Sequence, residues 1–434
     1  MLIIAKIILF VLCVCMFCVK RKYKIILFII PLLLFRYVNL FPGTFFFSIA
    51  DHCICTSFVL SELRFLRFSW KQLGTTHITM ALLLIMASDI VTTVNSNNNI
   101  IEGIVLLLED LLFKYLVILY AFHCYDEYIW KVKVPKVIFY CLIIMTLIGV
   151  INFCTQSNFY INSICAVDAP NNLDLMDGRF RVTATFIDPF HYGFACVICF
   201  LLLLFSYVND MCSRKISLVG CAMAAFGLIT NGSRTSIIVV VISVFIYFLR
   251  VMTVKSLIKK SIPIILVSVF FIMNLSALRM KIAESISIFQ IDSKVPGSSL
   301  SMRLTQFELA KDYMDNNFLW GHGIDFVNRH FFGKNAVINA DMDAFGFESE
   351  IFHLMINKGI IGLLAYLLFF LFLFAFFFLN RRINHADVIG MAITFSFFFF
   401  SIATGESASA PLAFLVIGSL IKDVQISDRQ IKTA

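Results

Sequence analysis

The chain has 434 residues, of which 60% are hydrophobic and only 14% charged, with a mean hydropathy of +0.91 and a formal net charge of +8. Ordinary soluble domains carry about 25% charged residues, so the composition excludes that class. It predicts an all-α polytopic membrane protein, because helices satisfy their own backbone hydrogen bonds in lipid. Lysines and arginines gather in short loops between apolar runs, so the positive charge does not indicate a nucleic acid partner.

Hydropathy predicts a bundle of about 12–13 transmembrane helices, each needing about 20 mostly apolar residues. The apolar runs lie at residues 5–19, 25–41, 43–60, 75–94, 101–122, 137–153, 191–208, 217–230, 235–250, 262–278, 351–379, 388–403 and 409–421. The first run has no small-residue cleavage site after it, so we expect a first span rather than a removed signal peptide. We interpret the 49 phenylalanines as side chains that mainly face lipid.

Basic clusters in alternate loops predict the orientation of the chain. They lie at residues 20–24, 64–71, 131–136, 214–215, 250–260, 381–382 and at Lys422. Short loops rich in Lys and Arg stay in the cytoplasm, so the loops between them belong to the other side. The chain is then expected to divide into N-terminal helices (1–153), a first outer loop (154–190), central helices with a Gly-Ser-Arg turn (191–278), a large outer loop domain with short helices (279–350), and C-terminal helices with a cytoplasmic tail (351–434).

Ionisable side chains interrupt several apolar runs, where charge is costly. Glu109, Asp110 and Lys114 lie inside one run. Asp110 and Lys114 are one helical turn apart, so a structural ion pair is the favoured interpretation. Asp89, His77 and Arg36 lie near the ends of runs, where we expect their side chains to reach the membrane surface.

Four arginines on the outer side break the charge rule. They are Arg179 and Arg181 in RFRVTATFIDPFHYG, Arg234 in LITNGSRTSIIVVV, and Arg303 in the predicted amphipathic helix SMRLTQFELAKDYMDN. A guanidinium binds phosphate oxygens with two parallel hydrogen bonds and stays protonated, and the backbone N–H groups at a helix start add to the positive field. We interpret these arginines as an anion site. The alternative for Arg234 is a side chain that anchors a short helical hairpin.

A polar cluster precedes the long apolar run in GFESEIFHLMINKGIIG. Glu348, Glu350 and His353 fall within two helical turns, and Glu350 and His353 share a helix face. A carboxylate or imidazole at this place is suited to take a proton from an attacking hydroxyl. These three residues are therefore the candidate catalytic residues, with helix capping by acidic side chains as the alternative.

Four stretches, taken in order, resemble the O-antigen polymerase and O-antigen ligase superfamily of bacterial inner membranes. They are RVTATFIDPFHYGFA, TNGSRTSII, SMRLTQFELAKDYMDNNFLWGHGIDF and ESEIFHLMINKGIIGLLAYLLFF. The resemblance implies a glycosyltransferase that uses sugars linked to undecaprenyl pyrophosphate and works on the periplasmic face. It also implies that Arg181 or Arg179, Arg234 and Arg303 hold the pyrophosphate, and that neither a metal nor another cofactor is needed, since the arginines stabilise the leaving group.

The two activities of this superfamily, polymerase and ligase, differ in the acceptor. Ligases carry a histidine followed by asparagine about eleven residues before the glycine of the long span, whereas here that position, counted from Gly359, is Glu348 followed by Ser349. His353 does not stand at that position. The resemblance therefore favours an O-antigen polymerase of lipopolysaccharide biosynthesis, with lipid-linked oligosaccharides as donor and acceptor, membrane lipid around it and a chain-length regulator as protein partner.

Two alternatives stay open. The first is an O-antigen ligase, or a capsule or exopolysaccharide polymerase of the same superfamily. The second is a flippase or other transporter of lipid-linked oligosaccharides, which would be expected to carry paired charges at mid-membrane and broken helices in both halves.

Overall fold

The computed structural model describes residues 2–41, 49–63, 77–95, 100–165, 180–251, 300–332, 347, 349–380, 385–405 and 409–433. Within these ranges the chain is helical throughout, apart from turns and one isolated bridge between Asn39 and Ile49. Among the described residues, seven helical stretches are long and apolar enough to cross a membrane: Ile78–Asn95, Ile129–Thr155, Pro189–Val208, Arg234–Val251, Glu350–Leu379, Ala386–Thr404 and Ala410–Ser427. The prediction of an all-α, multi-pass membrane protein is confirmed.

The N-terminal part of the bundle contains α1 (Leu2–Cys18), α2 (Lys24–Leu34), α3 (Ala50–Glu62), α5 (His77–Asn95), α6 (Ile100–Asp110), α7 (Leu116–Cys124) and α8 (Val134–Thr155). A π-helical turn, Leu111–Tyr115, joins α6 to α7. The remaining helices are α9 (Pro189–Val208), α10 (Arg214–Asn231), α11 (Arg234–Val251), α14 (Leu300–Asn316), α15 (Phe326–Phe332), α16 (Glu350–Leu379), α17 (Ala386–Thr404) and α18 (Ala410–Thr433). Every predicted apolar run overlaps a helix except 262–278, which lies outside the described residues. The run 101–122 is divided between α6, the π-helical turn and α7, and the run 25–41 is helical only as far as Leu34.

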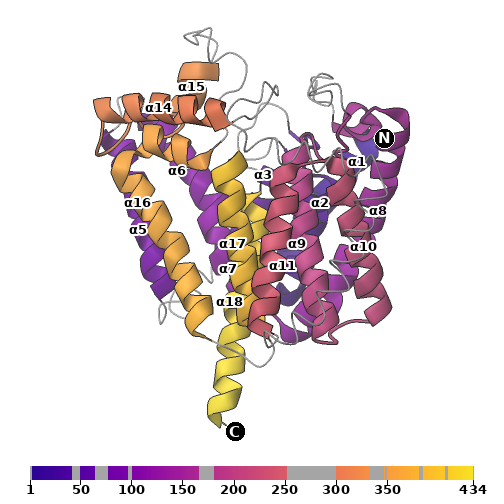
Figure 1. The fold of residues 1–434 in the computed structure, drawn as a ribbon. Coiled ribbons are helices and arrows are strands. Elements are labelled where there is room, and N and C mark those ends of the chain that lie inside the picture. The colour runs from indigo at the N-terminus through magenta and orange to yellow at the C-terminus, as the bar shows by residue number, and fades with distance from the viewer. Residues whose placement is uncertain are drawn as a thin grey trace.

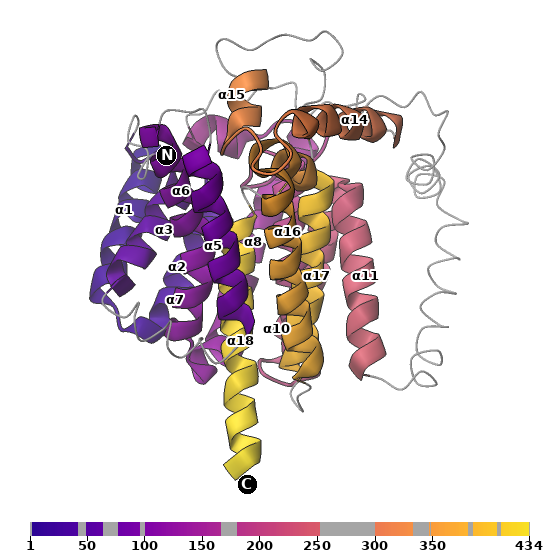
Figure 2. The same cartoon turned by 90° about the vertical axis from the view of Figure 1, so that its left-hand side faces the viewer.

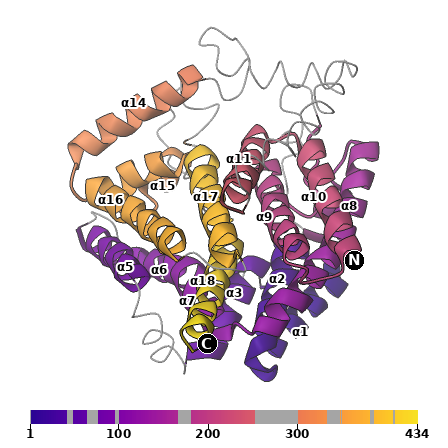
Figure 3. The same ribbon diagram turned by 60° about the horizontal axis from the view of Figure 1, so that its bottom comes forward.

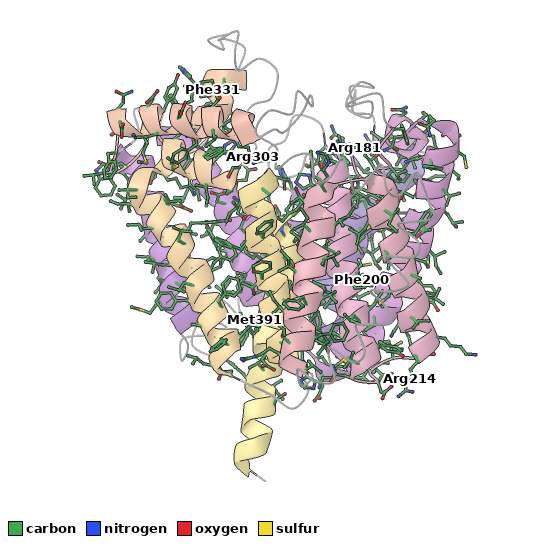
Figure 4. The ribbon with its side chains drawn as sticks, viewed as in Figure 1. Arg181, Phe200, Arg214, Arg303, Phe331 and Met391 are labelled. Atoms are coloured by element: carbon green, nitrogen blue, oxygen red, sulfur yellow. The ribbon has the colours of Figure 1, made fainter. Side chains whose placement is uncertain are left out.

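The long helices stand side by side, while α14 and α15 lie across one end of the bundle (Figures 1 and 2). We call this end, where Arg181 and Arg303 also lie, the outer end; Arg214 lies at the opposite, inner end (Figure 4). The C-terminal half of α18 extends beyond the inner end (Figure 3). This arrangement agrees with the predicted separation of the basic loop at 214–215 from Arg181 and Arg303.

Aromatic packing holds the C-terminal helices together. The ring of Phe414 on α18 lies against Phe369 of α16 and Phe397 of α17, with centroids 5.9 and 5.1 Å apart, and Phe194 of α9 lies 4.5 Å from Phe400 of α17. All five side chains are buried. The interpretation of phenylalanine as mainly lipid-facing bulk is therefore wrong for these helices, where the rings fill the space between them.

Helix α16 is broken at Gly359, whose φ of 61° and ψ of −161° are not helical. The turn after α14 fills the break and replaces the lost helical hydrogen bonds. The four backbone bonds run from His322 N to Ile356 O (2.8 Å), Gly323 N to Asn357 O (2.8 Å), Ile360 N to Phe318 O (2.9 Å) and Ile361 N to Leu319 O (3.3 Å). The outer loop is thereby attached to the core of the bundle at one place, because buried backbone groups need partners.

Gly359→Asn is expected to lower the free energy of unfolding by about 1–3 kcal/mol from backbone strain alone. A Cβ at this position would also lie 2.6 Å from the nitrogen of Gly321. Gly232→Asn is the matched control, because its φ of 68° and ψ of 12° suit asparagine and no atom lies within 4 Å. Thermal unfolding in detergent measures the stability of both variants. The unfolding is followed with a maleimide dye, which reacts with buried cysteines such as Cys53 and Cys196 once they become exposed. Equal stability of the two variants would contradict the docking described above.

Candidate functional site

The first two arginine motifs meet at one turn of the outer end. Helix α10 ends at Asn231, and α11 begins at Arg234. The Asn231 amide donates to the carbonyls of Val182 (3.0 Å) and Pro189 (2.6 Å), and its own oxygen accepts from the N–H of Ser233 (3.0 Å). Arg181 and Arg234, both half-buried, are therefore on segments that a single buried side chain ties together.

The segment that carries Arg181 is itself fixed before α9 begins. Thr185 donates to the carbonyl of Leu33 on α2 (2.7 Å). Asp188 caps α9 by accepting from the N–H of His191 (2.8 Å), and its carboxylate also contacts the His191 ring. Burial alone would raise the pKa of Asp188, but its interaction with His191 outweighs burial and the pKa lies below its ordinary value. The carboxylate is thus held in its ionised form beside this segment.

Arg303 reaches the same end of the bundle from α14. Its guanidinium donates to the carbonyl of Ala403 in the last turn of α17 (2.6 Å), where the helix leaves carbonyl groups without helical partners. Helix α17 packs against both α11 and α9. Arg303 therefore lies at the outer end of α17, and Arg181 lies farther along the same end of the bundle (Figure 4).

A cavity of about 530 Å³ opens between the starts of α3 and α16, the end of α6, the turn after α14 and the end of α17. Glu350 and His353 line it, as do Thr404 and Gly405. The structure thus brings these two candidate catalytic residues to one cavity. Glu348 and Arg179 lie outside the described residues.

The predicted arginines do not share this cavity. In the described part of its wall, none of Arg181, Arg234 and Arg303 appears. Among the described residues, the acid–base candidates therefore do not lie in an arginine-lined space. The cavity and Arg303 approach each other at the end of α17, where the carbonyl of Ala403 binds Arg303 and the next residue, Thr404, lines the cavity.

The orientation of the His353 ring follows from one hydrogen bond. Its Nε2 lies 2.9 Å from the carbonyl oxygen of Phe347. A carbonyl only accepts hydrogen bonds, so Nε2 carries the proton. In the neutral ring Nδ1 is then the basic nitrogen, which is the state required of a proton acceptor.

A cluster of buried charges lies at the floor of the cavity. The ammonium of Lys358, next to the break in α16, is 2.6 Å from Asp89 of α5 and 3.5 Å from Asp110 of α6. Asp110 also pairs with Lys114 at 2.9 Å, which confirms the predicted ion pair. Tyr115 donates to Asp89 (3.2 Å). Since uncompensated charge is costly here, these groups neutralise one another.

Sequence reasoning missed part of this cluster. Asp89 is fully buried, and Arg36 is 2% exposed and pairs with Asp51 at 2.7 Å. The expectation that both side chains reach the membrane surface is therefore wrong, because each has an oppositely charged partner inside the protein. The sequence does mark Lys358 as a candidate for such a cluster, because it is the one lysine in the apolar run 351–379 and directly precedes Gly359.

Residues 219–367 match the family described as O-antigen ligase. The matched segment includes Arg234, Arg303, Glu350, His353 and the broken part of α16, whereas Arg181 and the cavity walls from α3 and α6 lie before it. No curated protein matches the chain. Through residues 219–367, this chain is similar to the O-antigen ligase family, and the match supports the resemblance of its motifs to the O-antigen polymerase and ligase superfamily.

Proposed function

We propose that the protein is an O-antigen polymerase. It transfers the growing glycan from undecaprenyl pyrophosphate to a hydroxyl of a lipid-linked repeat unit, at the periplasmic face of the bacterial inner membrane. The observation that carries the proposal is the junction at the end of α17. Arg303 binds the carbonyl of Ala403 there, and the cavity that holds Glu350 and His353 begins at Thr404.

In this proposal the arginines bind the glycan donor through its pyrophosphate. Arg181, Arg234 and Arg303, together with Arg179, bind the pyrophosphate and stabilise the negative charge that it gains as the leaving group. Guanidinium groups perform this role without a metal because they stay charged and bind phosphate oxygens in pairs. The link between Val182 and Asn231 supports a shared role for Arg181 and Arg234.

In this proposal the cavity binds the acceptor. The acceptor hydroxyl forms a new bond to the anomeric carbon of the donor sugar, and the bond from that carbon to the pyrophosphate breaks with its electron pair on phosphate. Glu348 or Glu350 accepts the hydroxyl proton, with His353 as the second candidate. The hydrogen bond between His353 and Phe347 supports a basic Nδ1 in that role.

An O-antigen ligase is the second candidate, since the matched family carries that description. The polymerase is preferred because Glu348 stands where the ligases have histidine. A transporter is less well supported. Of the helices in the described ranges, α16 alone has non-helical dihedral angles inside it, whereas transporters of the broken-helix type have such breaks in both halves.

Deletion of the gene distinguishes these functions by the lipopolysaccharide pattern on a gel. We expect a core that carries one repeat unit and no ladder, with the ladder restored by the wild-type chain. A bare core in the deletion strain would instead indicate a ligase or a flippase. An unchanged ladder would contradict a role in polymer formation.

A further inference from the structure

The wall of the cavity is acidic. Among the described lining residues, five carboxylates face two lysines: Asp51, Glu109, Asp110, Asp325 and Glu350 against Lys114 and Lys358. Both lysines are already paired, Lys114 with Asp110, and Lys358 with Asp89 and Asp110, while Asp51 is paired with Arg36. With Arg36 and Asp89 included, the carboxylates still outnumber the cations. Such a wall attracts cations and repels anions, whereas a neutral group is not repelled, so it is unsuited to a pyrophosphate.

The same wall has the features of a sugar site. Its volume of about 530 Å³ falls within the roughly 300–1,000 Å³ of small-molecule pockets. Carboxylates accept strong hydrogen bonds from hydroxyl groups, and Glu109 and Glu350 reach the cavity from different helices, α6 and α16. Phe113, which stacks on His52 with ring centroids 4.3 Å apart, adds an apolar face.

We propose that this cavity is the acceptor-sugar subsite and that it takes a sugar without an anionic group. The inference rests on the proposed function and adds a substrate class to it. Glu109, 3.8 Å from His52, is the specificity-determining residue that lies outside the matched family segment. A uronic acid would bring its carboxylate against this wall, where like charges repel.

Saturation-transfer NMR on the purified full-length chain in detergent tests the subsite. The probes are the methyl glycosides of glucose, galactose, mannose and the two N-acetylhexosamines, with methyl glucuronide as the anionic counterpart of methyl glucoside. We expect transfer to at least one neutral glycoside and at least tenfold less to the glucuronide. Glu109→Gln should narrow that difference, and Leu106→Trp, which fills the cavity from α6, should remove the transfer.

The thermal unfolding assay confirms that both variants are folded before they are compared. Equal or stronger transfer to the glucuronide, no transfer to any neutral glycoside, or transfer that survives in folded Leu106→Trp would overturn the subsite. If the wild-type chain still restores the ladder in that case, the polymerase proposal stands without it. If neutral sugars bind as expected but the chain restores no ladder, the polymerase proposal falls and the sugar site remains.

Discussion

Arg234→Lys and Arg303→Lys are each expected to lower the yield of O-antigen ladder at least about a hundredfold, the effect of removing one well-placed donor from a developing anion. Lysine keeps the charge but lacks the planar fork that holds two phosphate oxygens. It can still donate to the carbonyl of Ala403, so Arg303→Lys is expected to retain the contact between α14 and the end of α17. Silver-stained lipopolysaccharide from the complemented deletion strain measures the loss.

Arg214→Lys is the control for both variants, because Arg214 is exposed at the inner end and its ion pair in the described part of the chain is with a neighbour on its own segment, Asp210. It should restore a full ladder. Immunoblots of membranes must show equal amounts of all three proteins. Wild-type ladders from both Arg234→Lys and Arg303→Lys, at equal protein levels, would remove the anion site from the proposal.

Lys358→Met is expected to destabilise the protein by about 3–5 kcal/mol, because removing one partner of a buried ion pair leaves an uncompensated charge. The charge left behind is Asp89, which is fully buried on α5. Tyr115 supplies only one hydrogen bond to it. Thermal unfolding with the maleimide dye measures the effect, and a lower amount of protein in the membrane is expected in cells.

A second substitution separates charge from packing at this position. Asp89→Asn combined with Lys358→Met removes both charges, and the double variant should recover most of the lost stability. Arg214→Met, whose ion pair with Asp210 lies in solvent, should leave the unfolding temperature unchanged. If Lys358→Met alone unfolds at the wild-type temperature, the charge cluster does not stabilise the fold.

Local features were predictable from the sequence. The apolar run 351–379 corresponds to α16, Glu350–Leu379, because an uninterrupted stretch of this length can satisfy its backbone only as a helix. The Asp110–Lys114 pair was predictable for a similar reason, since the two residues are one turn apart on one helix. The distribution of basic residues among the loops predicts that Arg214 and Arg303 lie at opposite ends of the bundle, as the structure shows.

Contacts between distant segments were not predictable in this way. Lys358 and Asp89 are 269 residues apart, and Asn231 and Val182 are 49 apart. Gly359 lies inside the apolar run 351–379, which predicts one continuous helix, whereas the turn after α14 supplies the backbone partners that allow a break there. The separation of the arginines from the cavity depends on how α17 packs between α16 and α11.

By itself, the sequence determined the class of protein, the positions of most of its helices, the opposite ends at which Arg214 and Arg303 lie, and the residue types available for chemistry. Hydrophobicity and helical periodicity act over short stretches of chain, so they can be read locally. The tertiary structure alone decided which charges are buried together, where the cavity lies, and that its acidic wall is distinct from the arginines. These features arise where α3, α6, α16 and α17 meet. Buried polar groups are stable there only when partners from other helices are in place.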